Sequence, residues 1–421
     1  MTRRCILALI LASVCFISNP IVAHEALPPP QLPREGLDYY FSPIRWMPIY
    51  MHSQIYLLDQ RPNEILFSKK QPSLINLGNR LAINGGVIAQ GVFGNRPNTS
   101  PFPAPGNNSL NLRAAYFGFT GYLTSWARAY VSLNYEPTSI STATGEPFTA
   151  PEMEQAYVQM NNASKHFRFD LGKQYLPFSV YEHYPVVTSL PQRLSEINKV
   201  AAVFTVNYHP FFASAYAFSA QGKSNGYNNP EKNQIANGGA DIGFHNQNKK
   251  FGYEATLGYM NNLAETRFIY FLIKATHEKV GAISVHFNFN IERFGFISNA
   301  IIAAQKFSPL DITYDHQGAQ PAAYEAKINY VIEVHRHPLV PMIAYETSSQ
   351  ALFLSVPRYD YVFSLEYWIN KYLSTTAELI AAKNYSAGNT GTYATSAMTF
   401  GTTTGNGKWN NVGILELSAR F

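Results

Sequence analysis

Short segments in which apolar and polar residues alternate restrict the fold of this chain more than any other feature. The clearest one is 324–334, where every second residue from Tyr324 to Val334 is apolar or aromatic, and the intervening positions are mostly Glu, Lys and Asn. Successive side chains of a β-strand point to opposite faces, so this spacing predicts a strand with one apolar and one polar face. Residues 359–369 and 373–381 repeat the pattern. We therefore expect an all-β protein.

Segments of this kind recur from about residue 81 to the end of the chain, and the gaps between them alternate between short and long. A transmembrane antiparallel β-barrel with an even number of strands requires this alternation, because its periplasmic turns are short and its extracellular loops are long. A sandwich or a propeller predicts no such alternation. We expect a barrel of about 16 strands, over residues 81–93, 110–122, 126–136, 152–161, 165–174, 199–208, 212–221, 236–245, 251–260, 281–290, 293–306, 321–333, 339–348, 358–370, 372–383 and 411–421.

One gap between the expected strands is ambiguous. Within 262–280, residues 268–273 are apolar enough to form either a further strand or a helix inside a loop. A strand there would change the strand count of the barrel.

Composition agrees with a membrane-spanning wall. The chain is 14% aromatic, with 28 Tyr and 28 Phe, and only 14% of its residues are charged, whereas a typical soluble domain is nearer to about 25% charged. No stretch is a run of about 18 apolar residues, as a membrane-spanning helix requires. A net charge of +5, spread along the chain, predicts no nucleic-acid partner.

The first 23 residues have the pattern of a secretory signal peptide. Two arginines precede an apolar run over 6–17, and the segment ends in Ala23, a small residue suited to cleavage. An apolar run of about 12 residues is too short to span a bilayer as a helix. We expect 1–23 to be a signal peptide.

The segment that follows the expected signal differs from the rest of the chain. Prolines recur throughout residues 24–80, so we expect a short periplasmic lead-in segment before a barrel formed by 81–421. Both cysteines, Cys5 and Cys15, lie inside the expected signal. The sequence therefore predicts neither disulfides nor thiolate chemistry in the mature protein.

The last strand carries a further signal. Leu415, Leu417, Ala419 and Phe421 alternate with polar or smaller residues and form an apolar face. A terminal Phe on such a face resembles the strand that the outer-membrane assembly machinery recognises. The expected location is the outer membrane of a Gram-negative bacterium. The expected partners are outer-membrane lipid and the assembly machinery, the latter through the Phe421 strand.

A distinctive block follows the fifth expected strand. Residues 172–178 read Gly-Lys-Gln-Tyr-Leu-Pro-Phe, and residues 184–190 read Tyr-Pro-Val-Val-Thr-Ser-Leu. This block resembles the siderophore-porin family typified by the legiobactin receptor, most sharply over 167–200. The resemblance implies a 16-stranded barrel without a large plug that takes up a ferric siderophore or similar small chelate through its lumen. A similar strand-end pattern occurs in anion-selective porins, so a general or ion-selective porin without a dedicated ligand is the alternative.

The loop at 175–198 is the candidate ligand-contacting segment. Its aromatic side chains offer stacking surface, its mixed charges can meet polar groups of a ligand, and its prolines lower the entropy lost on ordering. We expect it to fold over or into the pore; an ordered surface loop is the alternative. The candidate ligand-binding and pore residues are Lys173, Gln174, Tyr175, Phe178, Tyr181, Arg193 and Glu196, together with Arg128 and Arg168 on the lumen wall.

The polar faces of the expected strands describe the lumen. Acidic residues outnumber basic ones on these faces, which disfavours an anionic cargo in the pore itself and leaves the loop cations to meet it. The basic residues expected to point inward are Arg128, Arg168, Lys327 and Arg420. The acidic ones are Asp170, Asp241, Glu254, Glu325, Asp360, Glu366, Glu378 and Glu416.

Catalytic and metal-binding signals are weak. His335 and His337 form a short pair in an expected turn without Cys or carboxylate support, which is more typical of solvated histidines than of a metal site. Ser214, Ser298 and His286 are candidates for a barrel enzyme, but no motif joins them. We expect a protein that is not an enzyme and has no cofactor and no metal.

Overall fold

A computed structural model of the chain describes residues 75–77, 81–94, 109–124, 126–135, 151–162, 166–179, 188–219, 234–247, 251–273, 277–335, 337–370, 372–395 and 400–420. The expected signal peptide, nearly all of the expected lead-in, Tyr181 and Phe421 lie outside these residues.

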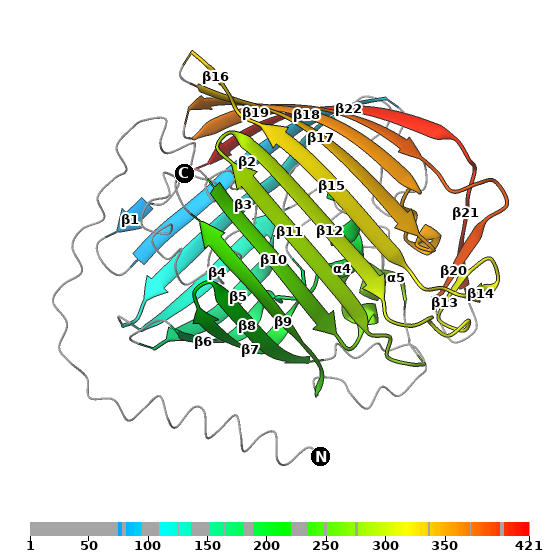
Figure 1. Ribbon diagram of the computed structural model, residues 1–421, viewed down its shortest axis with the longest axis horizontal. Coiled ribbons are helices and arrows are strands. Elements are labelled where there is room, and N and C mark those ends of the chain that lie inside the picture. Colours follow the sequence, from blue (N-terminus) through cyan, green and yellow to red (C-terminus); the bar gives the residue numbers. More distant parts are fainter. Residues whose placement is uncertain are drawn as a thin grey trace.

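Sixteen strands form one closed antiparallel barrel (Figure 1). The wall closes where the first long strand pairs with the last, in a register that joins Gly86 to Arg420 and Gly94 to Val412. The strands of the wall are β2 (Leu81–Gly94), β3 (Ser109–Tyr122), β4 (Ala127–Tyr135), β5 (Glu152–Asn161), β6 (Phe167–Tyr175), β7 (Asn198–Tyr208), β8 (Phe211–Ser219), β9 (Ile235–Gln247), β10 (Phe251–Met260), β11 (Ala282–Ile291), β12 (Phe294–Ala303), β15 (Ala322–Tyr330), β17 (His337–Ser349), β18 (Tyr359–Asn370), β19 (Leu373–Lys383) and β22 (Trp409–Arg420).

Two short strands extend this wall. β16 (Ile332–Val334) continues the line of β15 beyond Val331 and pairs with β17. β1 (Ile75–Leu77) pairs with the first residues of β2, next to the stretch of β2 that pairs with β22. Every expected strand is therefore present, with ends that differ from the expected ones by a few residues.

The ambiguous gap at 262–280 is a loop that contains helices. It holds a 3-10 helix, η4 (Leu263–Glu265), and an α-helix, α5 (Arg267–Leu272). Two other long loops form an unexpected sheet of β13 (Ile312–Tyr314), β14 (Gln317–Gly318), β20 (Thr390–Ala394) and β21 (Phe400–Thr404). No helix in the described part of the chain is long and apolar enough to span a membrane.

The two faces of the wall differ as the alternation predicts. On β11, the side chains of Ile283 and Val285 are 41% and 46% exposed, whereas those of Ser284 and His286 between and beside them are buried. Apolar residues outside and polar residues inside are the arrangement that lipid and a hydrated lumen require. The alternation in the sequence thus reports the inner and outer faces directly.

The extracellular half of the barrel interior contains an apolar cluster, which we call the loop core. Inward residues of the wall strands, including Val203, Ile301 and Ala323, belong to it. Four loops pack onto them: L3 (176–197), L5 (261–281), L6 (304–321) and L7 (350–358), the last of which holds η5 (Leu352–Leu354). Apolar burial of this kind fixes loops that would otherwise be free at the surface.

Candidate functional site in the barrel lumen

The two described ends of loop L3 contact strands of the wall other than β6 and β7. Just after β6, the backbone carbonyl of Phe178 accepts a hydrogen bond from Ser284 Oγ on β11. At the far end of the loop, the backbone N–H of Leu190 donates to Glu346 Oε2 on β17 at 2.7 Å. The loop therefore contacts strands that lie far from its own hairpin, as expected of a loop that folds into the pore.

A short helix, α4 (Leu190–Ser195), forms the part of L3 that meets this wall. Ser189 precedes it with extended backbone and a side chain that accepts from Gln192 N, and Pro191 lies in the first turn, where a missing N–H costs nothing. The helix packs against β12, β15 and β17 and is drawn inside the barrel in Figure 1. Ser189 and Pro191 thus favour the start of the helix at this point, and packing against the wall strands fixes its position.

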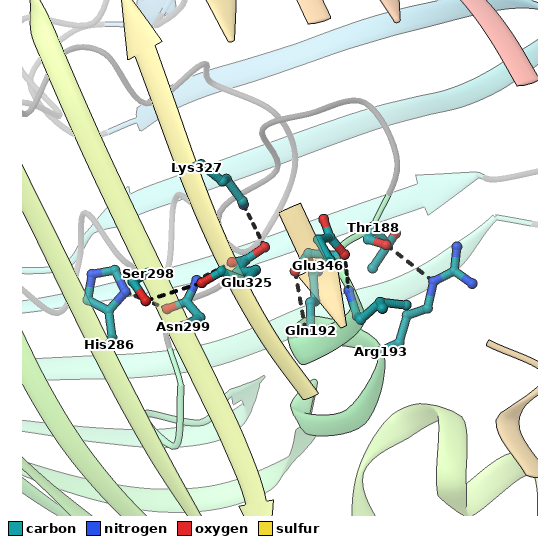
Figure 2. A network of polar contacts seen from close by, with 11 residues as sticks. Thr188, Gln192, Arg193, His286, Ser298, Asn299, Glu325, Lys327 and Glu346 are labelled. Carbon is teal, nitrogen blue, oxygen red and sulfur yellow. Dashed lines mark hydrogen bonds and ion pairs between the residues drawn. The ribbon is translucent and has the colours of Figure 1, made fainter. Parts of the chain in front are cut away.

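Three carboxylates face α4 from neighbouring strands. Glu325 on β15 pairs across the sheet with Glu346 on β17, which in turn pairs with Asp360 on β18. Figure 2 shows Glu325 and Glu346 beside the labelled residues of L3. Directly opposed like charges on one face of a sheet repel each other. The arrangement therefore calls for cations.

Two cations of the chain lie near the carboxylates. Lys327 Nζ is 3.1 Å from Glu325 Oε2. Arg193 of α4 donates from Nε to the carbonyl of Thr188 at 3.2 Å, and the charges of Asp360 and Glu346 act on its guanidinium. Enclosure lowers the pKa of Arg193 from its ordinary value, and these two carboxylates oppose that shift.

The row of inward polar residues continues on the other side of Glu325. Asn299 on β12 pairs with Glu325, His286 on β11 pairs with Asn299, and Thr256 on β10 pairs with His286. Asn299 Nδ2 donates to Glu325 Oε1, and His286 Nδ1 lies 2.6 Å from Asn299 Oδ1 (Figure 2). We call the residues Thr256, His286, Asn299, Glu325, Glu346 and Asp360 the polar row.

The polar row lies directly beneath the loop core. The inward positions two residues nearer the loops are Ser284 on β11, Ile301 on β12 and Ala323 on β15. Ser284 binds the L3 backbone, while Ile301 and Ala323 belong to the loop core. An apolar layer therefore meets a polar layer at this level of the lumen.

Ion pairs fasten L3 and the adjoining first residues of β7 to L5. Glu196 Oε1 at the end of α4 accepts from Arg267 Nη1 of α5 at 2.9 Å, and Lys199 Nζ at the start of β7 lies 2.8 Å from Glu265 Oε2 of η4. The Lys199 ammonium also lies 4.2 Å from the ring centroid of Tyr270. We call the pairs Glu196–Arg267 and Lys199–Glu265 the L3–L5 latch.

A second charged network lines the wall near the periplasmic ends of β4, β5 and β6. Arg128 Nε donates to Gln159 Oε1 at 2.5 Å, and Gln159 Nε2 donates to Asp170 Oδ1 at 2.9 Å. Arg168 donates from Nε to the other oxygen of Asp170 at 2.7 Å, and its Nη2 lies 2.7 Å from the same oxygen as an ion pair. Two of the arginines predicted to face the lumen, Arg128 and Arg168, therefore share one network.

The predicted site residues separate into groups. Gln174, Tyr175 and Phe178 are fully or almost fully buried, with the Tyr175 hydroxyl bonded to Glu154. Arg193 and Glu196 lie on α4 and at its end. Tyr181 is outside the described residues. Lys173 departs from the prediction: it pairs with outward-facing Val200 and donates to the Met153 carbonyl, because Gln174 takes the inward position at this strand end.

The acidic bias expected for the lumen wall is present among the described residues. Asp170, Asp241, Glu254, Glu325, Glu366, Glu378 and Glu416 are buried on the inner face, as are Arg128, Arg168 and Lys327. Asp360 shares that face, since it pairs with inward Glu346; nothing is described for the Arg420 side chain. Sequence reasoning missed Glu346, whose inward neighbours Val340, Met342 and Ala344 are apolar and form their own cluster. Counting every second residue from Met342 would have found it.

The candidate catalytic residues do not meet as a set. Ser298 Oγ donates to the carbonyl of Glu325, while His286 is engaged with Asn299, and Ser214 is bonded to Thr205. Among the described residues, no group of three His, Cys, Asp or Glu side chains has the arrangement of a metal site.

Similarity to known proteins agrees with this architecture. No family model matches the chain. UPF0422 proteins of Legionella pneumophila strains Paris and Lens are each 23% identical over 281 residues, covering 62% of this chain and 51% of the relative. The chain thus spans about half the length of the curated relatives it matches.

Solved structures give the same picture at the level of the fold. An anion-selective porin from Comamonas acidovorans has a TM-score of 0.52 at 12% identity, over 81% of this chain and 99% of that one. Salmonella typhi OmpF, in a complex with daunomycin, has a TM-score of 0.51 at 10% identity, over 81% and 97%. The protein is a porin-like β-barrel of the Gram-negative outer membrane.

Proposed function

We propose that this protein is a selective uptake channel that carries a ferric siderophore or a similar small chelate through its lumen. The observation that supports this most is that L3 is held by distant strands at two points, by β11 at Phe178 and by β17 at Leu190. A loop fixed in this way narrows the passage and brings side chains to where a solute must travel. Selective passage needs both properties.

The buried aromatic residues of L3 serve as anchors in this proposal. Phe178 belongs to the loop core and Tyr175 is bonded to Glu154, so both hold the loop instead of facing a solute. Arg193 remains as the L3 cation that lies near the inner-wall carboxylates Glu346 and Asp360. Arg128 and Arg168 provide further positive charge on the wall.

A cation-preferring porin without a dedicated ligand is the second candidate. The carboxylates of β15, β17, β18, β19 and β22 support it, because an acidic wall attracts cations and repels anions. The negative charge of this wall also limits which chelate the proposed uptake channel could carry. A neutral or positively charged chelate would pass it more readily than an anionic one.

Deleting residues 180–192 tests the role of L3. We expect higher single-channel conductance in planar bilayers and loss of binding for the member of a ferric-siderophore panel that binds the purified wild-type barrel. Arg193→Gln should weaken that binding, while Lys173→Gln, on the outer face, is the matched control and should leave it unchanged. Unchanged conductance on deletion, with no panel member bound by the wild type, would favour the general porin.

A further inference from the structure

The inner wall directly below α4 contains polar groups that the proposed chelate uptake does not use. We infer that the polar row from His286 to Asp360 is a binding site for a solute that carries several ammonium groups. The inference rests on the proposed function only in requiring that solutes enter the lumen. It adds the charge and shape of the group that this wall recognises.

The charge of the row is the first part of the argument. Glu325, Glu346 and Asp360 stand on three consecutive strands, directly across from one another. Adjacent strands are about 4.8 Å apart, so the three carboxylates span about 10 Å. Lys327 is paired with Glu325 at one end, and Arg193 lies near Glu346 and Asp360. Three carboxylates therefore face two cations, and one negative charge is left without a counterion. A linear chain of ammonium groups matches this spacing.

The second part of the argument concerns His286, which is 2% exposed and has no partner for Nε2. A carboxylate only accepts, so Glu325 receives the amide N–H of Asn299, and Asn299 Oδ1 is left to face His286 Nδ1. Nδ1 must then carry the hydrogen. In the neutral ring, Nε2 is therefore a bare acceptor.

The imidazole that carries this acceptor lies on the inner face of the wall. The neighbours of His286 along the strand, Val285 and Phe287, are exposed on the outer face, so the imidazole is on the inner one. Two more buried acceptors along the row have no partner, Thr256 Oγ1 and Asp360 Oδ1. Acceptors at both ends and carboxylates between them suit a ligand with N–H donors along its length.

The fixed orientation of the row favours binding over simple electrostatic attraction. His286, Asn299 and Glu325 hold one another through consecutive hydrogen bonds (Figure 2), and Glu346 is held by the Leu190 N–H. A preorganised set of acceptors loses little freedom when a ligand binds. An acidic lumen without such a set would attract cations but would not distinguish among them.

Spermidine is a suitable probe, because it carries three ammonium groups on a linear chain of comparable length. Its block of KCl current through the purified barrel is measured in planar bilayers, and its binding to the detergent-solubilised barrel by calorimetry. We expect block at concentrations at which a neutral polyol of similar size has no effect. Glu346→Gln and Asp360→Asn should each raise the blocking concentration at least tenfold, and His286→Ala several-fold.

Glu366→Gln is the matched control, because it removes an inner-wall carboxylate of β18 that lies outside the row. It should change block less than twofold. Heat-modifiable migration on gels identifies any variant that has not folded, and the three row variants are independent of one another. Equal loss in Glu366→Gln and the row variants, or no block of the wild type, would overturn the inference. Spermidine binding without any siderophore binding would leave it standing and reject the chelate as cargo.

Discussion

Breaking the L3–L5 latch at its more buried pair should release L5 from the lumen. Glu265→Gln removes the carboxylate from Lys199, and the two side chains are only 8% and 4% exposed. Removing one partner of a buried pair costs about 3–5 kcal/mol, since the other charge stays buried. At about 1.4 kcal/mol per tenfold change, even the lower figure reduces the ratio of docked to undocked L5 about 100-fold.

Hydrogen exchange of the α5 region measures this change. The amides of Tyr270 and Ile273 are protected by bonds to Thr266 and Ile269, so they exchange when L5 undocks. We expect them to exchange about 100-fold faster in Glu265→Gln, with flickering of the single-channel current.

Two further variants make the test specific. Lys199→Met in the Glu265→Gln background removes the buried charge and should recover most of the protection. Arg267→Ala breaks the other pair, in which the arginine side chain is 30% exposed and Glu196 keeps the hydrogen bond from Gln192 Nε2, so it should speed exchange much less than Glu265→Gln. Exchange in Glu265→Gln within twofold of wild type, or a double variant no better than the single one, would refute the reasoning.

Two other predictions concern the wall. Phe421→Asp should reduce insertion into the outer membrane, because it places a charge on the apolar face of the closing strand; the position is near the rim, so recognition by the assembly machinery should matter more than lipid contact. Wild-type levels of heat-modifiable barrel would contradict this, and Phe421→Tyr is the control. Gly172→Ala should lower the temperature at which the folded band is lost, because φ is +137° there and a Cβ would lie 2.3 Å from the Ala156 carbonyl oxygen. Gly121→Ala, with nothing within 4 Å of the added carbon, should not.

The wall was predictable because each of its strands must satisfy lipid on one side and water on the other. That requirement repeats every two residues, so the expected strand 251–260 coincides with β10 and the expected 152–161 with β5. Closure through β2 and β22 then follows, since an open edge has no hydrogen-bond partners in a membrane. The alternation of apolar and polar residues within each strand is therefore enough to predict the barrel.

The interior was less predictable, because its contacts join residues far apart in the chain. Leu190 meets Glu346, and Lys199 meets Glu265, and no local pattern marks either pairing. The apolar run at 268–273 fitted a strand or a helix equally well. It is a helix because Ile269 and Ile273 pack into the loop core, which no single segment reveals. Lys173 was misplaced because a strand end can put either of two neighbours inward.

The loop core also imposes an order of assembly. Its apolar residues come from Leu176 to Val356, in loops that hang from different hairpins. They come together only after the wall has curved enough to bring those hairpins around a common interior. Until then these side chains are exposed to water on the extracellular side of the membrane. The loop core therefore loses its contact with water last, after the lipid-facing surface of the wall has formed.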